Sequence, residues 1–141
     1  MSASSLRYQA VKVGDRLPDL PIGITTSLVV AGALASQDYT PVHHDKAAAQ
    51  AAGMQDVFMN ILTTNGLVSR FVTDWAGIDA RVSGVNIKLG TPNLPGDTMT
   101  LRGSVVAKDD AAHTVTVSVQ GKNSWGDHVT GTVKLVLPTG A

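Results

Sequence analysis

The hydrophobic pattern of the chain changes near residue 80. Before this point, apolar side chains recur at spacings of three and four residues, which predicts helices. After it, apolar and polar side chains alternate, which is typical of antiparallel strands with one buried face. The pattern therefore predicts helices in the first half of the chain and a sheet in the second.

The first predicted helix covers residues 28–35, and a short strand at residues 22–24 precedes it. Thr and Ser at residues 25–27 are N-cap candidates, because their hydroxyls can accept hydrogen bonds from the first turn. This helix must end near Asp38, since Pro41 disfavours helical geometry in the residue before it.

Two further helices have recognisable ends. Asp45 can cap a short helix over residues 46–52, which Gly53 closes. The longest periodic segment follows Asp56 and ends at Gly77. Its apolar positions are Phe58, Ile61, Leu62, Val68, Phe71, Val72 and Trp75. Because these positions cover more than one face, we expect other elements to wrap this helix.

Four alternating runs, at residues 85–89, 99–105, 115–119 and 133–137, predict a meander of strands. A long buried helix followed by such a meander satisfies both elements if the sheet curls around the helix. The expected architecture is α+β, a single domain with a curved antiparallel sheet wrapped around a long central helix. It spans residues 1–141, with residues 1–11 as a flexible N-terminus.

Composition narrows the function classes. Charged residues are only 16% of the 141, and the net charge is zero. Few charges leave apolar surface uncovered, which favours an oligomer, and the charge balance argues against nucleic acid as a partner. The chain has no cysteine, which excludes disulfides and thiolate chemistry. Neither a signal peptide nor a membrane span is recognisable, so a cytoplasmic protein is expected.

The candidate chemistry lies at Asp38 and His43, five residues apart. A carboxylate and an imidazole side by side can share one water, one group taking its proton while the other gives a proton. Taken singly, Asp38 is better explained as a loop or C-terminal cap residue, and His43 as a structural histidine hydrogen-bonded within a turn. Taken together, with the capped helix and the downstream segments, they favour a catalytic pair. His113 and His128 begin or precede strands and are expected at the surface.

A metal site is not expected. His43, His44 and Asp45 are compact in sequence, but adjacent residues rarely point at one ion, and no further ligand has suitable spacing.

Several segments resemble the MaoC-like proteins, which are hot-dog-fold (R)-specific enoyl-CoA hydratases and dehydratases. Residues 38–43 are similar to their signature Asp-x-Asn-Pro-(aliphatic)-His, which a short helix follows. Residues 90–98 resemble their Pro-x-x-x-Gly-Asp loop, and residues 123–131 their last hairpin. The resemblance covers roughly residues 12–137 and implies a single hot-dog domain.

The resemblance also implies roles for particular residues. Asp38 and His43 would activate water for addition to a trans-2-enoyl-CoA thioester, with Thr40 and His44 supporting them. The backbone N–H groups of Asn60 and Ile61, at the start of the central helix, would bind the thioester oxygen. No cofactor is implied, because coenzyme A is part of the substrate.

Two residues depart from the family pattern. Thr40 stands where the family usually has Asn, so the hydrogen bonds around Asp38 must differ. Asn60 stands where it usually has Gly, and the added Cβ narrows the approach to the helix N-terminus.

Residues 42–45, 60–63, 66–68 and 72–77 resemble, within this family, the small subunit of actinobacterial steroid side-chain hydratases. This narrower resemblance implies a steroid acyl-CoA substrate, although the residues leave a linear acyl chain open. It also implies a second MaoC-like subunit, with heterodimeric pairs forming a heterotetramer; a homodimer is the alternative.

Two other functions stay open. One is a non-catalytic hot-dog subunit that completes a partner's acyl-CoA tunnel. The other is an acyl-CoA thioesterase, which is disfavoured because that chemistry usually places its acid on the central helix and residues 57–73 contain none.

Overall fold

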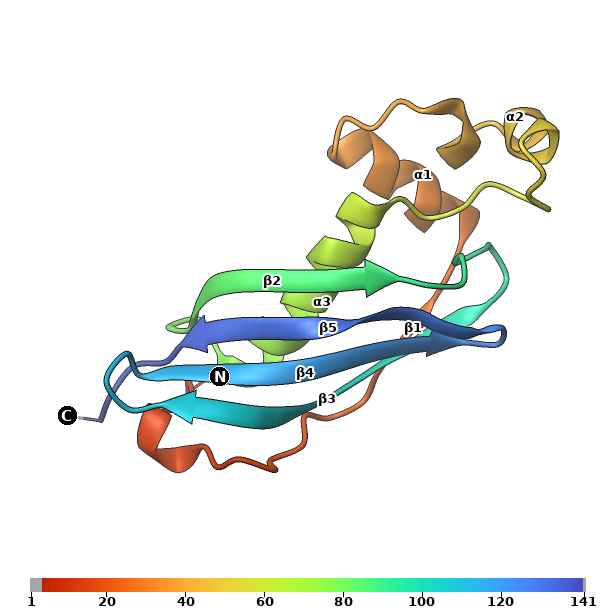
Figure 1. Cartoon of the computed structure of the whole chain (residues 1–141). Coiled ribbons are helices and arrows are strands. Elements are labelled where there is room, and N and C mark those ends of the chain that lie inside the picture. Colours follow the sequence, from red (N-terminus) through yellow and green to blue (C-terminus); the bar gives the residue numbers. More distant parts are fainter. Residues whose placement is uncertain (1–3, 141) are drawn as a thin grey trace.

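The computed structural model describes residues 4–140 and shows one curved sheet with helices on one side (Figure 1). The helical elements are η1 (Tyr8–Ala10), α1 (Thr26–Ala35), η2 (Pro41–His43), α2 (Lys46–Ala51) and α3 (Ile61–Ala76). The strands are β1 (Leu20–Gly23), β2 (Arg81–Leu89), β3 (Thr98–Asp109), β4 (Thr114–Asn123) and β5 (Gly126–Val136). The strand order is β1-β3-β4-β5-β2, and every pair is antiparallel. The predicted meander is therefore correct for β3 to β5 but wrong for β2, which pairs with β5 instead of β3.

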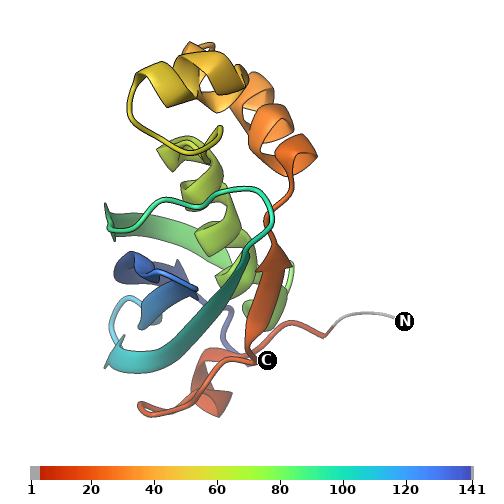
Figure 2. The ribbon, with the colours of Figure 1, turned by 90° about the vertical axis from the view of Figure 1, so that its right-hand side faces the viewer.

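Helix α3 lies in the hollow of the sheet, as the sequence predicts (Figure 2). The core between them is formed by apolar side chains from both, including Val68, Phe71, Val72, Leu101, Val105, Val117, Val133 and Leu135. Each such side chain contributes about 1.5–3 kcal/mol when fully buried. Helices α1 and α2 stand beyond one end of the sheet, next to the start of α3 (Figure 2).

The predicted caps set the ends of the first two helices. The Thr25 hydroxyl accepts a hydrogen bond from the Leu28 N–H at 3.0 Å at the start of α1. The Asp45 carboxylate accepts from two N–H groups at the start of α2, and Gly53 follows that helix with φ of 91°. A cap of this kind contributes about 1 kcal/mol, which helps to fix such short helices.

The central helix starts later than the periodicity predicts. Helix α3 begins at Ile61, and Asn60 is its N-cap. Residues 57–60 form no regular structure, and the Met59 N–H donates to the Asn93 carbonyl at 3.1 Å. The apolar spacing continues through Phe58 because both sides of the cap are partly buried, so periodicity alone does not reveal the cap.

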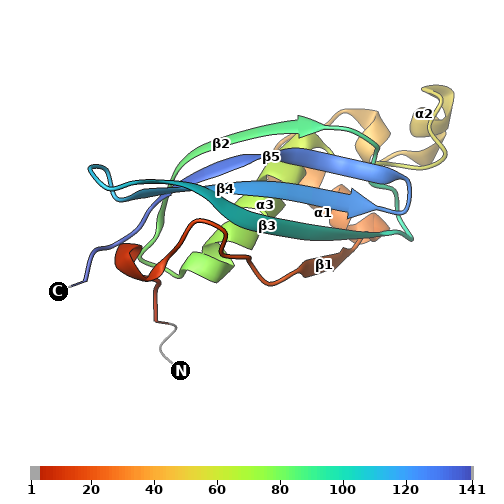
Figure 3. The same cartoon turned by 60° about the horizontal axis from the view of Figure 1, so that its bottom comes forward.

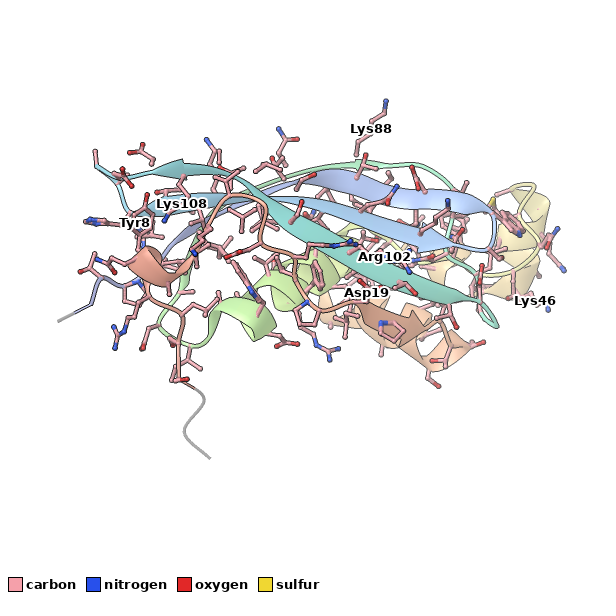
Figure 4. The ribbon with its side chains drawn as sticks, turned by 90° about the horizontal axis from the view of Figure 1, so that it is seen from below. Tyr8, Asp19, Lys46, Lys88, Arg102 and Lys108 are labelled. Atoms are coloured by element: carbon pink, nitrogen blue, oxygen red, sulfur yellow. The ribbon has the colours of Figure 1, made fainter. Side chains whose placement is uncertain are left out.

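The expectation of a flexible N-terminus is wrong for its described part, residues 4–11. The Tyr8 ring is buried, its hydroxyl donates to Asp110 at 2.6 Å, and Lys108 Nζ lies 4.0 Å from the ring centre (Figure 4). Burial, with the hydrogen bond to Asp110, raises the pKa of Tyr8 to about 12. Residues 1–3 of the predicted segment lie outside the described residues.

Strand β2 forms one edge of the sheet, and the short β1 forms the other (Figure 3). Among the described residues, β2 pairs only with β5, so its second edge has no strand partner. The apolar side chains of β2, such as Val85 and Ile87, are only half-buried. A long edge strand of this kind is open to pairing with another chain.

Candidate active site

The structure brings Asp38 and His43 together at the turn after α1. Just after the helix, Gln37 has a left-handed conformation, with φ of 57°. The Asp38 N–H then donates a hydrogen bond to the Ala33 carbonyl at 2.9 Å. Pro41 then starts the single turn η2, which carries His43. As a result, His43 Nε2 lies 3.3 Å from Asp38 Oδ2.

The orientation of the His43 ring is set by the irregular segment before α3. Its Nδ1 lies 2.7 Å from the Phe58 carbonyl, and the Phe58 ring packs against it edge-on. Because a carbonyl only accepts, Nδ1 must donate, and the neutral ring therefore presents an unprotonated Nε2 to Asp38. The residue is 8% exposed, so the ring has little room to turn.

The Asp38 carboxylate is held on both oxygens. Oδ1 accepts from the Thr40 hydroxyl at 2.7 Å and from the Thr40 N–H at 3.3 Å, while Oδ2 accepts from Asn60 Nδ2 at 3.0 Å. The Thr40 hydroxyl above all, and then Asn60, hold the pKa of Asp38 below its usual range. Asp38 is therefore ionised at neutral pH, and its side chain, 23% exposed, stays open to water.

The start of α3 presents backbone donors beside this pair. Within the described part of the chain, the N–H groups of Asn60 and Ile61 have no hydrogen-bond acceptor. They lie at the positive end of the helix dipole, which favours a developing negative charge. As whole residues, Ile61 is 47% exposed and Asn60 is 2% exposed.

The Asn60 side chain is fully engaged in contacts within the chain. It is 2% exposed and turned toward Asp38 and Ser36, while its Oδ1 accepts from the Thr63 N–H at 3.0 Å. These side-chain contacts were not predicted from the sequence. An Asn before an apolar helix can be predicted as its N-cap from the sequence. No feature of the sequence predicts the contact of Asn60 with Asp38, 22 positions away.

The two residues expected to support the pair differ in their placement. Thr40 contacts Asp38 directly. His44 is exposed, with Nε2 3.2 Å from the Tyr39 carbonyl, and none of its side-chain hydrogen bonds to described residues reaches Asp38 or His43.

The expectation that His128 lies at the surface is wrong. His128 is 2% exposed, with Nδ1 2.7 Å from the Thr91 carbonyl and Nε2 2.9 Å from the Thr64 hydroxyl on α3. Burial lowers its pKa from the usual 6.5. Because His128 follows a turn, the sequence predicts that it is exposed. In the structure, β5 begins two residues before it, and its side chain lies on the face of the sheet that contacts α3.

Other kinds of site find little support in the described residues. Between residues 4 and 140, no three His or Asp side chains gather as a metal site would require. Nor is any helix in that range both long enough and apolar enough to cross a membrane.

The fold agrees with the comparison to known families. Residues 10–126 match the family described as "MaoC like domain", and the chain belongs to this family. It is 46% identical over 125 residues to the 3-oxo-4,17-pregnadiene-20-carboxyl-CoA hydratase beta subunit of Mycobacterium tuberculosis. That match covers 89% of this chain and 95% of the relative.

Solved structures give the same family and fold. A chain in the crystal structure of the ChsH1-ChsH2 complex from Mycobacterium tuberculosis superposes with a TM-score of 0.86 at 45% identity, covering 89% of this chain and 98% of that one. The unliganded R-hydratase PhaJ1 from Pseudomonas aeruginosa superposes with a TM-score of 0.87 at 20% identity, covering 96% and 88%. The second likeness shows the fold alone. The fold is the hot-dog fold, as the sequence resemblance implies.

Proposed function

We propose that this chain is the catalytic MaoC-like subunit of an enoyl-CoA hydratase in steroid side-chain degradation. The observation that carries the proposal is the 3.3 Å approach of His43 Nε2 to Asp38 Oδ2, beside the start of α3. The 46% identical relative, a 3-oxo-4,17-pregnadiene-20-carboxyl-CoA hydratase beta subunit, supports the substrate class.

In the proposed reaction, Asp38 and His43 bind one water between them. One of the two groups removes a proton as the water oxygen forms a bond to the β-carbon of the trans-2-enoyl thioester. The carbon–carbon π electrons move toward the carbonyl, and the α-carbon then takes the proton that was removed from the water, returned by the group that accepted it or passed through the second group. The product is the 3-hydroxyacyl-CoA, with no cofactor beyond the coenzyme A of the substrate.

The N-terminus of α3 supplies the electrophilic part of this mechanism. The N–H groups of Asn60 and Ile61 would donate to the thioester oxygen as negative charge develops on it. A donor in such a position typically contributes about 3 kcal/mol of transition-state stabilisation. In this proposal the helix dipole acts in the same direction.

The proposal includes a second MaoC-like subunit, arranged in heterodimeric pairs that form a heterotetramer. The relative is a beta subunit, and the similar crystal structure is of a complex of two proteins. In this chain, the open edge of β2 and the exposed residues Leu34, Tyr39 and Leu62 are consistent with surfaces that a second subunit would cover.

Hydration can be tested directly with site variants. The chain is co-expressed with a candidate second subunit, and loss of the enoyl-thioester absorbance is followed for wild type, Asp38→Asn and His43→Ala. Loss of general acid–base catalysis predicts a fall in kcat of about 100-fold or more in each variant. His113→Asn is the matched control, because His113 is exposed at the β3–β4 turn and Asn tolerates its φ of 50°.

The same assay separates the alternatives. Unchanged hydration in both variants would favour a non-catalytic subunit that completes the tunnel of its partner. Release of free coenzyme A without hydration would identify a thioesterase. Activity of the chain alone, at the rate of the assembly, would contradict the need for a second subunit.

A further inference from the structure

We propose that the Asn60 side chain is a positioning residue, which holds Oδ2 of Asp38 at His43 through its amide group. This inference rests on the proposed function, in which Asp38 and His43 act on water. It assigns a role to the side chain of Asn60, separate from that of its backbone N–H.

The amide of Asn60 uses all of its hydrogen-bonding capacity. Nδ2 donates to Asp38 Oδ2 at 3.0 Å and to Ser36 Oγ at 2.9 Å, while Oδ1 accepts from the N–H and the hydroxyl of Thr63 at 3.0 and 2.5 Å. The assignment of N and O is unambiguous. The reverse orientation would set the amide oxygen against a carboxylate and the amide nitrogen against a backbone N–H.

Ser36 fixes the second N–H of this amide. Its hydroxyl donates to the Gly32 carbonyl at 2.7 Å in the last turn of α1, so an oxygen lone pair is directed at Asn60. Asn60 therefore joins the end of α1, from which Asp38 extends, to the first turn of α3. With the residue 2% exposed, its side chain is confined to this arrangement.

The contact lies on the oxygen that matters for the proposed chemistry. Oδ2 receives the Asn60 amide and also faces His43 Nε2, whereas Oδ1 is occupied by Thr40. Without the amide, the carboxylate is held on Oδ1 alone and can rotate Oδ2 away from the imidazole. The carboxylate would also lose a donor that favours its ionised form.

Few other groups affect the titration of this carboxylate. The side chains that hydrogen-bond to Asp38 or lie within ion-pair distance of it come from Thr40, Asn60 and His43, and of these only His43 is an ionisable type. Between residues 61 and 69, α3 carries no charged residue, and α1 carries none over its whole length. A change in the pKa of Asp38 when Asn60 is replaced by an uncharged residue therefore reports the amide contact, whereas Asn60→Asp adds the repulsion of a second carboxylate.

Two variants separate positioning from helix capping. Asn60→Ser keeps a good N-cap but lacks the amide. Asn60→Asp keeps the cap and the size but replaces the donor with a second carboxylate. We expect kcat to fall about tenfold in Asn60→Ser with KM changed by less than about twofold, since the contact positions a catalytic group rather than substrate. In both variants the pKa of Asp38, followed by carboxyl carbon NMR, should rise, and more in Asn60→Asp.

Asn65→Ser is the matched control on the same helix. Among the described residues, the Asn65 side chain has no hydrogen-bond partner, so this variant should leave the pKa of Asp38 unchanged.

The outcomes separate this inference from the proposed function. A wild-type Asp38 pKa in both Asn60 variants would overturn the inference, even if thermal stability falls, because Asn60 would then act only as a cap. A wild-type kcat in Asn60→Ser would also overturn it. If Asp38→Asn retains full hydration while the Asn60 variants still shift the pKa of Asp38, the proposed function fails and the contact stands.

Discussion

At the residue scale, the site depends on how one carboxylate is hydrogen-bonded. The sequence identifies Asp38, His43 and Thr40, because they lie within six residues of one another around a proline. It does not identify Asn60, Ser36 or the Phe58 carbonyl as their partners. Those contacts join segments 15 to 24 residues apart, and only the packing of α1 against the start of α3 brings them together.

Thr40 gives the first test at this scale. Its hydroxyl is the largest cause of the lowered pKa of Asp38, so Thr40→Val should raise that pKa. If the ionised carboxylate is required, the acidic limb of the kcat/KM profile should move to higher pH. Thr40→Ser keeps a hydroxyl at the same place and should restore the wild-type profile. Identical pH profiles for Thr40→Val and wild type would show that this hydrogen bond does not set the ionisation that matters.

His128 predicts a pH dependence of stability that is independent of catalysis. Its folded pKa lies below 6.5, so the unfolded chain binds a proton that the folded chain does not. Stability is therefore full above about pH 6.5 and falls as the pH decreases below it, by at most about 1.4 kcal/mol per pH unit.

The measurement is denaturant unfolding at pH 7.5 and pH 5.5. His128→Gln should be less stable at pH 7.5, because it disturbs the hydrogen bonds to Thr91 and Thr64, but its stability should vary less between the two pH values. Carboxylates with lowered pKa, such as Asp38 and Asp97, lose their contribution only at lower pH and do not obscure this window. An equal pH dependence in variant and wild type would rule out His128 as the cause.

At the element scale, the sequence predicts nearly all of the fold. The alternating runs give β2 to β5, and the caps Thr25 and Asp45 give the starts of α1 and α2. The start of α3 is the exception. The apolar periodicity extends through Phe58, but residues 57–60 are not helical, and the Met59 N–H donates to the Asn93 carbonyl instead. Periodicity reports which residues are buried, and it does not report where a helix is capped.

The packing of α1 on α3 positions the site, and Gly32 allows it. A Cβ on Gly32 would collide with the side chain of Thr63, which is short and already hydrogen-bonded to Asn60. Gly32→Ala should therefore push α1 away from α3, at a cost of about 1–3 kcal/mol. Hydration should fall as well, because Ser36 and Asp38 move away from Asn60.

Gly66→Ala is the control for this packing test. A Cβ on Gly66 meets nothing within 4 Å in the described structure, and alanine favours a helix by about 1 kcal/mol over glycine. The variant should unfold at the same temperature as wild type or higher. If Gly32→Ala matches it in stability and in activity, then α1 is not held by this contact.

At the scale of the whole molecule, two surfaces of the described chain have no packing partner within the chain. One is the open edge of β2, nine residues long, with half-buried apolar side chains. The other is the apolar surface around the start of α3, where Leu34, Ile61 and Leu62 are about half exposed. The low charge content of the sequence favours an oligomer, but it does not show which surface is covered. That requires the strand order, which places β2 at an edge although β2 precedes the other three long strands in the chain.

Hydrogen exchange tests whether the second subunit covers the β2 edge. In the chain alone, the outward N–H groups of β2 should exchange quickly, because the only strand that pairs with β2 in residues 4–140 is β5. In the assembly with a second MaoC-like subunit, strand pairing across this edge should slow their exchange by about tenfold or more, since opening would then require separation of the subunits. Strand β1, at the opposite edge and only four residues long, is the internal control and should change little.

An assembly that forms while β2 exchanges as in the free chain would place the interface elsewhere, with the apolar surface at the start of α3 as the next candidate. Slow exchange of β2 already in the isolated chain, together with a dimeric mass, would instead favour the homodimer.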